Sequence, residues 1–190
     1  RVVAALRPGE QVPGLAASDD CRAGSRWTWD GVRFEVLYPT DDDVATARNS
    51  NAVSCVLRIS NGRTSVLLVG DLEAPQEQLL LQRQLPLRSD VVLVPHHGSN
   101  TSSTAAFLQS VRPRLALVQS GYRNSYGHPT ARVLARYAEH NVRVFDSPSC
   151  GAMHWHSTAP EQVLCERDLS RRYWRFDAQP GRQQDIASGP

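Results

Sequence analysis

Residues 91–99 read Val-Val-Leu-Val-Pro-His-His-Gly-Ser, an apolar run that ends in a proline and two histidines. The consecutive apolar residues predict a short strand over Asp90–Val94 that is buried on both of its faces. Strands of this kind belong to layered α/β proteins, in which the loops at strand ends carry the chemistry. Because two imidazoles at a buried strand end are costly without partners, we assign His96 and His97 a functional role.

The sequence on either side alternates between strand and helix signals. Upstream, Val53–Ser60 and Thr64–Val69 flank Asn61-Gly62, the strongest short signal for a β-hairpin. The other expected elements are a strand at Phe34–Tyr38, an acidic loop at Asp41–Asp43, a helix with Pro75 in its first turn, a helix near Ser103–Ser110, a strand at Leu115–Val118, a helix over Pro129–Glu139, a strand at Val142–Phe145, and a strand pair at Ala152–His156 and Gln162–Glu166. This order predicts an α/β fold with a mixed sheet and helices on its outer face.

The composition excludes several classes of protein. With 190 residues, 41% of them hydrophobic, the chain can form the core of one domain or of part of one. A net charge of +2 gives no strong field toward nucleic acid or an anionic membrane. No window approaches roughly eighteen consecutive apolar residues, so we expect no transmembrane segment in this chain. We take residues 1–176 as the folded part and residues 177–190 as a disordered tail.

The four cysteines lack any Cys-x-x-Cys spacing, which excludes a zinc finger and a thioredoxin-type motif. Cys150 and Cys165 flank the expected terminal strand pair. A disulfide between them in an oxidising compartment and a pair of buried free thiols are both open readings.

Three polar clusters occupy equivalent places in the pattern. Asp71, the pair His96 and His97, and the loop with His128 each follow the end of an apolar strand. A carboxylate and imidazoles at one sheet edge suit Zn²⁺ or Mn²⁺, which lowers the pKa of water and polarises a phosphoryl oxygen. Capping roles compete for two of these residues: Asp71 before the helix from Ala74, and His128 beside the proline of the next helix.

The run Arg171-Arg172-Tyr173-Trp174-Arg175 mixes guanidinium and aromatic groups near the end of the chain. This composition fits base stacking and phosphate binding, and it fits an amphipathic docking segment equally well.

Several segments in sequence order resemble the metallo-β-lactamase-like domain of ComEC-type DNA-internalisation proteins. They are Trp27–Pro39, Val66–Asp71, Val91–Ser102, Gly121–Pro129 and the closing Arg-Arg-Tyr-Trp. The resemblance implies an αββα sandwich, of which this chain is the carboxy-terminal portion. It also implies that Asp71 bridges metal ions, that His96 or His97 or both ligate one, and that His128 and Asn124 line the site near the scissile phosphate.

The resemblance further implies a function in natural transformation. Members of the family are inner-membrane proteins that pass one DNA strand into the cell. Their metallo-β-lactamase-like domain is placed outside the cytoplasm, in the periplasm, next to the transmembrane channel domain of the same chain. It is regarded as a metal-dependent nuclease that degrades the strand that is not transported.

One departure from the family pattern is large: the His-x-His/Asp-x-Asp-His run that supplies most metal ligands does not occur. The chain opens with Arg1 and has one methionine, Met153, so we expect a fragment cut after that motif. Its divalent metal site (Zn or Mn) is then incomplete, and the chain alone is expected to be inactive. A non-catalytic DNA-positioning module and a metallo-hydrolase of another substrate are the alternatives.

Overall fold

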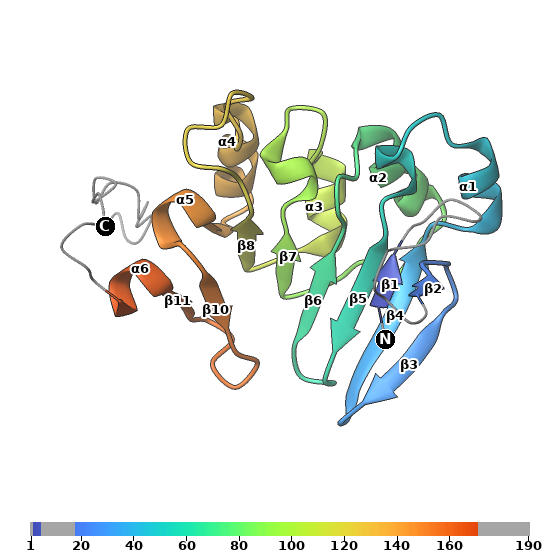
Figure 1. Ribbon diagram of the computed structural model, residues 1–190, viewed down its shortest axis with the longest axis horizontal. Coiled ribbons are helices and arrows are strands. Elements are labelled where there is room, and N and C mark those ends of the chain that lie inside the picture. The colour runs from blue at the N-terminus through green and yellow to red at the C-terminus, as the bar shows by residue number, and fades with distance from the viewer. Residues whose placement is uncertain (1, 5–17, 171–190) are drawn as a thin grey trace.

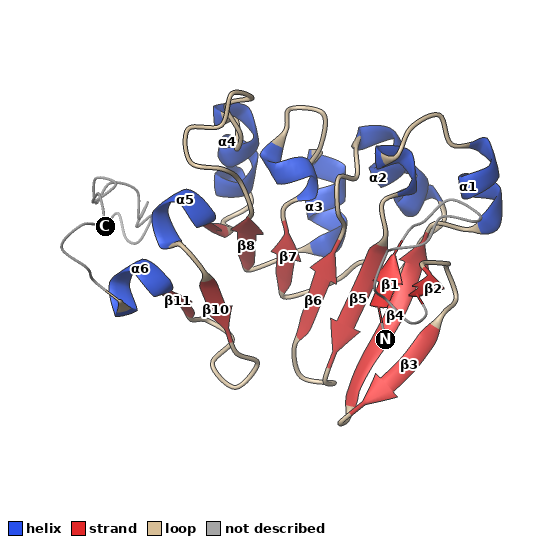
Figure 2. Cartoon of the chain, in the orientation of Figure 1, coloured by secondary structure: helices blue, strands red, loops and turns tan. Residues whose placement is uncertain are grey.

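A seven-stranded mixed sheet is the centre of the computed structural model, which describes residues 2–4 and 18–170 (Figures 1 and 2). The strand order is β3-β4-β5-β6-β7-β8-β9. The strands are β3 (Arg26–Trp29), β4 (Val32–Tyr38), β5 (Val56–Ser60), β6 (Ser65–Leu68), β7 (Val91–Leu93), β8 (Leu115–Val118) and β9 (Arg143–Asp146). Pairing is antiparallel from β3 to β6 and parallel from β6 to β9. The predicted hairpin at Asn61-Gly62 joins β5 to β6.

The helices are short. They are α1 (Asp41–Thr46), α2 (Ala74–Gln82), α3 (Ala105–Val111), α4 (Ala131–Glu139), α5 (Ser147–Cys150), α6 (Glu166–Leu169) and the 3₁₀ turns η1 (Asn51–Val53) and η2 (Pro95–Gly98). Two small sheets pair β1 (Val2–Ala4) with β2 (Ser18–Asp20), and β10 (Met153–Trp155) with β11 (Val163–Cys165). The predicted α/β class with a mixed sheet is therefore confirmed. None of the helices in the described ranges has the length and apolar character needed to cross a bilayer.

Helices α2, α3 and α4 connect the parallel strands and pack over one face of the sheet (Figure 2). Parallel strands need such crossovers, and each of the three helices contributes buried apolar side chains to the core. Leu67, Val92 and Ala116 of the sheet, with Leu80 and Phe107 of the helices, are fully buried in this core. The carboxyl ends of β6, β7 and β8 consequently meet along one edge, called the rim below.

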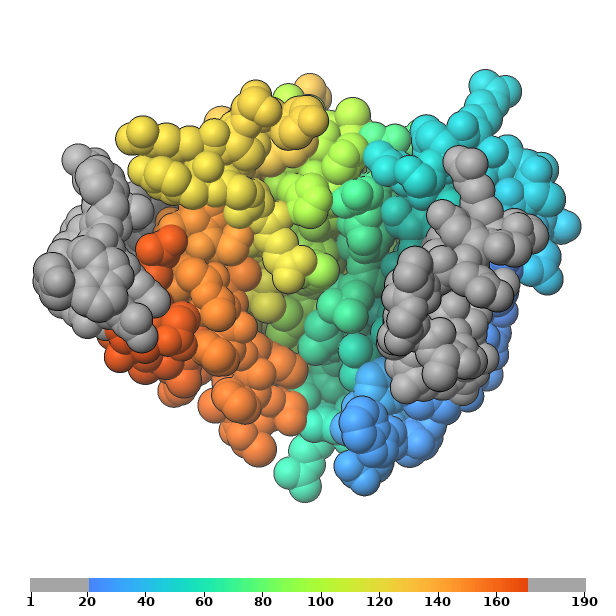
Figure 3. Space-filling model, viewed as in Figure 1, coloured from blue at the N-terminus to red at the C-terminus, as the bar shows by residue number. Residues whose placement is uncertain are grey.

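The opposite face of the sheet is also apolar. Register places Leu57 beside Leu68, Leu93 beside Leu117, and Leu117 beside Phe145 on this face. All five side chains are only partly buried, and Figure 3 views the middle strands from this side. The described residues form one principal sheet, so the expected αββα sandwich is not confirmed.

One expected loop is a helix. Asp41–Asp43 opens α1, and Thr40 caps it through a capping box with Asp43. Aspartates disfavour helix interiors, but in the first turn they meet unpaired N–H groups and the positive end of the helix dipole. The Asp43 carboxylate also forms two hydrogen bonds of 2.7 Å with Arg83 of the α2 C-cap. Reading the acidic run as a loop was therefore wrong.

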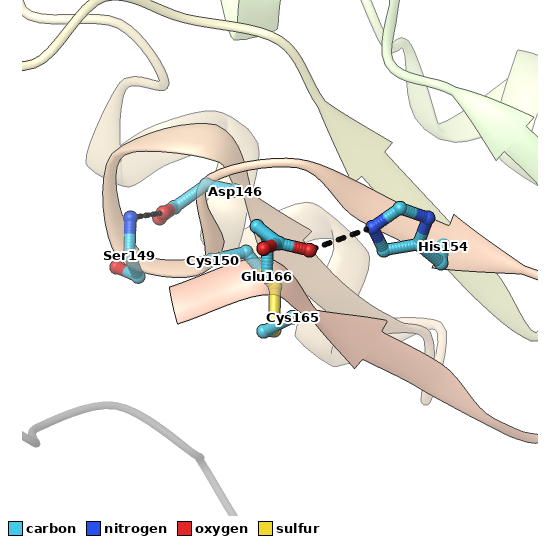
Figure 4. Close-up of a disulfide and its surroundings, with 6 residues drawn as sticks. All are labelled: Asp146, Ser149, Cys150, His154, Cys165 and Glu166. Atoms are coloured by element: carbon cyan, nitrogen blue, oxygen red, sulfur yellow. Dashed lines mark hydrogen bonds and ion pairs between the residues drawn. A yellow bond between two sulfur atoms is a disulfide. The ribbon is translucent and has the colours of Figure 1, made fainter. Parts of the chain in front are cut away.

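All four cysteines are paired. Cys21 is bonded to Cys55, 34 positions further along the sequence, and Cys150 is bonded to Cys165 (Figure 4). The reading as free thiols was wrong. The second disulfide joins α5 to β11 beside the ion pair of His154 with Glu166, whose atoms Nε2 and Oε2 are 3.2 Å apart. The Arg171–Arg175 run and the tail expected from residue 177 lie outside the described residues.

Candidate functional site

The rim brings the ends of three parallel strands together. Asp71 follows β6, His96 and His97 follow β7 in η2, and the loop 121–128 follows β8. His96 N–H donates to the Gly70 carbonyl (3.0 Å), which ties the first two of these segments, and Asp71 N–H donates to Ser54 Oγ (3.1 Å), just before β5. The backbone at Gly70, Asp71 and His96 is thus held by one backbone bond and by the Ser54 hydroxyl.

Backbone strain is concentrated at the two histidines. His96 (φ 47°), His97 (φ 54°) and Gly98 (φ 84°) lie consecutively in the left-handed region. This conformation costs roughly 1–2 kcal/mol for each non-glycine residue. Residues held there against that cost cluster at functional sites. The turn explains how two adjacent imidazoles both reach the rim instead of pointing to opposite sides, as they would on a continuing strand.

The His97 ring is oriented by the backbone of the next strand. Its Nδ1 lies 2.5 Å from the Gln119 carbonyl oxygen, and its Nε2 lies 3.5 Å from Asp71 Oδ1. Since a carbonyl oxygen only accepts, Nδ1 donates to Gln119, and Nε2 is the nitrogen that faces Asp71. A histidine held by its other nitrogen in this way is the arrangement found at metal ligands. Both side chains are about half exposed.

His96 pairs with a carboxylate that the sequence analysis missed. His96 Nδ1 is 3.3 Å from Glu73 Oε1, and Thr101 Oγ1 donates to that same oxygen at 2.9 Å. Glu73 stands two residues after Asp71, so the spacing Asp-x-Glu after a strand was a signal for it. Glu73, not Asp71, occupies the N-cap position of α2, so the reading of Asp71 as a helix cap was wrong.

His128 lies on the third segment, 6.0 Å from His96 between ring centroids. Asn124 fixes its backbone: the amide oxygen accepts from His128 N–H (2.9 Å), and the amide nitrogen donates to the His128 carbonyl (2.7 Å). The cap of α4 is Thr130, so the capping reading of His128 was wrong. Burial, followed by the nearby His96 and His97, lowers the pKa of His128, which favours a neutral ring near pH 7.

The donor set suits a divalent ion in part. Two ligands on one tetrahedral zinc at about 2.05 Å are separated by about 3.3 Å. The observed 3.5 Å between His97 Nε2 and Asp71 Oδ1 is close to this value. However, no group of three or more such donors gathers at one point among the described residues. These residues therefore offer two donor pairs, Asp71–His97 and Glu73–His96, rather than a complete site.

Gly98 permits two loops of the rim to touch. A Cβ on Gly98 would lie 2.6 Å from Pro129 Cβ and 2.9 Å from Pro129 Cα. The Gly98 carbonyl also accepts from Thr130 N–H at 3.0 Å. The close approach holds the turn with the two histidines against the segment that carries His128.

Replacing Gly98 with alanine is expected to lower the free energy of unfolding by about 3 kcal/mol, from overpacking and left-handed strain together. The measurement is urea denaturation of the folded protein. Gly127→Ala is the matched control, because Gly127 has φ 66° and open space around it, and its expected loss is about 1 kcal/mol. Equal losses in the two variants would rule out the close contact as the cause.

A buried carboxylate holds the backbone segment that follows η2. Glu77 of α2 is fully buried and accepts from Ser103 N–H (2.5 Å) and Thr104 N–H (2.8 Å). Arg136 of α4 donates to the carbonyls of Ser102 and Ser103 (2.7 and 2.5 Å). Together they clamp the segment that follows the two histidines. Burial raises the pKa of Glu77, and the amide hydrogen bonds and Arg136 only partly oppose it.

The raised pKa predicts a pH dependence of stability. The unfolded chain ionises Glu77 near its ordinary value of 4.5, and the folded chain does so only at higher pH. The contribution of Glu77 to stability is therefore full below pH 4.5 and is lost as pH rises through the folded-state pKa. Glutamine has no proton to lose. We therefore expect the difference in free energy of unfolding between the wild type and Glu77→Gln to decrease as the pH is raised above 4.5. Urea unfolding curves recorded at a series of pH values measure it. A difference that grows with pH would contradict this assignment.

No family model matches the chain. It is 40% identical over 134 residues to competence protein ComA of Neisseria gonorrhoeae, covering 70% of this chain and 19% of ComA. It is 36% identical to recombination protein 2 of Haemophilus influenzae (69% of this chain, 16% of that protein). It is 35% identical to ComE operon protein 3 of Bacillus subtilis (65% and 16%).

The chain spans between 16% and 20% of the length of the curated relatives it matches. Three of these carry names that refer to competence or recombination, in three organisms. Identities of 35–40% over most of the chain come together with the motif order noted in the sequence. The chain therefore belongs to the ComEC-type family of competence proteins, of whose members it matches one segment.

Proposed function

We propose that the chain is part of a DNA-uptake protein for natural transformation, and that its rim is part of a nuclease site that degrades the strand that is not transported. The observation that carries the proposal is the pairing of Asp71 with a strained, oriented His97 at the ends of two parallel strands. The competence names of the relatives support the cellular role.

The proposed site divides the work among the rim residues. Asp71 and His97 would hold one divalent ion, with His96 and Glu73 beside it. When bound, Zn²⁺ or Mn²⁺ supplies a water of lowered pKa and polarises the phosphoryl oxygen. The neutral His128, held by Asn124, would contact the phosphate or the leaving oxygen.

We also propose that a second sheet covers the partly exposed apolar face, giving the αββα sandwich and the missing ligands. The face includes Leu57, Leu68, Leu93, Leu117 and Phe145. A sheet face in contact with water would instead carry polar side chains at such positions. A contiguous apolar face that is left partly exposed normally marks an interface. In this proposal the second sheet belongs to the same polypeptide.

The proposed compartment is the periplasm, beside a transmembrane channel domain of the same polypeptide. Both disulfides support it, and no free cysteine occurs among the described residues. Disulfides persist in oxidising compartments and are rare in the cytosol.

The test is DNA cleavage by the complete polypeptide encoded by the reading frame, purified in a bilayer mimetic. End-labelled DNA is incubated with Mn²⁺ or Zn²⁺, and with a chelator in parallel. Cleavage that needs the metal supports the proposal. DNA binding without cleavage at any metal concentration would refute the nuclease and favour the DNA-positioning module.

A further inference from the structure

A cleft of about 570 Å³ opens beside the rim, between the loop 121–128 and the end of β8. Its lining includes His97, Asn124, Tyr126 and His128. The volume is within the range of sites for small molecules, about 300–1,000 Å³. The cleft therefore has room for one nucleotide-sized group immediately next to the Asp71–His97 pair.

Tyr126 forms an aromatic platform at the edge of this cleft. Its ring stacks on His128 with centroids 5.7 Å apart and planes at 25°. It is nevertheless 80% exposed, so a face of the ring remains open. Neither the metal pair nor the core uses this side chain.

A second aromatic residue and a cation stand on the same loop. Tyr122 is 53% exposed, and the Arg123 guanidinium carbon lies 5.2 Å from the Tyr122 ring centroid. Aromatic rings interleaved with arginine are the composition that binds single-stranded nucleic acid, through base stacking and contacts to the phosphate backbone.

The loop is held in shape, so the platform is preorganised. Besides its two bonds to His128, the Asn124 side chain donates to the Gly121 carbonyl at 3.0 Å. Backbone bonds from Asn124 to Gly121 (3.3 Å) and from Gly127 to Asn124 (3.1 Å) close the turns of the loop. Little ordering entropy is then spent when a base stacks on Tyr126.

We propose that Tyr126 stacks on an unstacked nucleobase of single-stranded DNA and thereby positions the neighbouring phosphodiester at the Asp71–His97 pair. The inference rests on the proposed function and names the form of DNA that the site accepts. In a duplex, base faces are covered by their neighbours and cannot meet a tyrosine ring. A chain with a net charge of +2 also has little electrostatic attraction for DNA, so stacking must supply much of the affinity.

The test measures binding separately from cleavage. The complete polypeptide is titrated, with chelator present, into a single-stranded oligonucleotide containing 2-aminopurine, whose fluorescence is quenched by stacking. Tyr126→Ala is expected to raise Kd for the single strand about tenfold and to reduce the quenching. Tyr126→Phe is expected to keep both, because the ring remains. Trp29→Ala is the control: Trp29 is 69% exposed at the β3–β4 turn, at the sheet end away from the rim, and its loss is expected to change nothing.

The outcomes separate the two proposals. Metal-dependent cleavage with an unchanged Kd in Tyr126→Ala would overturn the stacking role and leave the nuclease standing. Tyr126-dependent quenching without cleavage would refute the nuclease and support the stacking role. Equal weakening of single-strand and duplex binding would overturn the choice of single strands.

Discussion

Alanine in place of Asp71 or His97 is expected to reduce metal-dependent DNA cleavage at least about a hundredfold. Loss of a residue that merely orients a metal ligand costs 10–100-fold, so loss of a proposed ligand should cost no less. Both side chains are about half exposed, and their contribution to folding is correspondingly small. The measurement is the initial rate on end-labelled DNA as Mn²⁺ is titrated, with the complete polypeptide and each variant.

His140→Ala is the matched control for these substitutions. His140 is the C-cap residue of α4, at the end of that helix away from His128. Its loss is expected to leave the rate within about twofold, with a small decrease in stability. If Asp71→Ala and His97→Ala cleave as fast as the His140 variant, the rim is not the nuclease site.

Removing the Cys21–Cys55 disulfide by a double substitution to serine is expected to lower the free energy of unfolding by about 4 kcal/mol. The bond closes a loop of 34 residues, and the entropy of the unfolded chain rises by about this amount when such a loop opens. Cys21 is also fully buried, so serine leaves a polar group in the core. Urea denaturation of the oxidised protein and the double variant measures the difference.

The second disulfide supplies an internal comparison. Cys150 and Cys165 close a loop of 15 residues, for which the same relation gives about 3 kcal/mol. The corresponding serine double variant is therefore expected to be destabilised less than the first. If the Cys21/Cys55 double variant unfolds at the same midpoint urea concentration as the wild type, this disulfide does not stabilise the fold.

Local signals predicted most of the sheet. The hairpin between β5 and β6 follows from Asn61-Gly62, and β7 and β8 follow from unbroken apolar runs. Helix α1 was missed because three consecutive aspartates are poor helix formers everywhere except at the N-terminus. The Cys21–Cys55 bond was missed because nothing local relates residues so far apart. The α1 error overlooked a local signal, the capping box of Thr40 and Asp43, whereas the disulfide is a contact that only the folded chain creates.

The sequence predicted which residues form most of the candidate site, but not how they are oriented. Asp71, His96, His97 and His128 do gather on one rim, since the ends of parallel strands meet there. The left-handed turn at the histidines and the Gln119 carbonyl that orients His97 have no sequence signal. A backbone oxygen is present at every residue, and its role depends only on where the chain passes.

The parallel half of the sheet has a consequence for how fast the protein assembles. β6, β7 and β8 pair only after helices α2 and α3 have closed long crossovers, and distant pairings of this kind form slowly. The donors after β6 and β7 meet only once the first crossover has closed, and His128 joins them only after the second. A chain still leaving the ribosome therefore presents separate histidines and carboxylates, and the rim matures late.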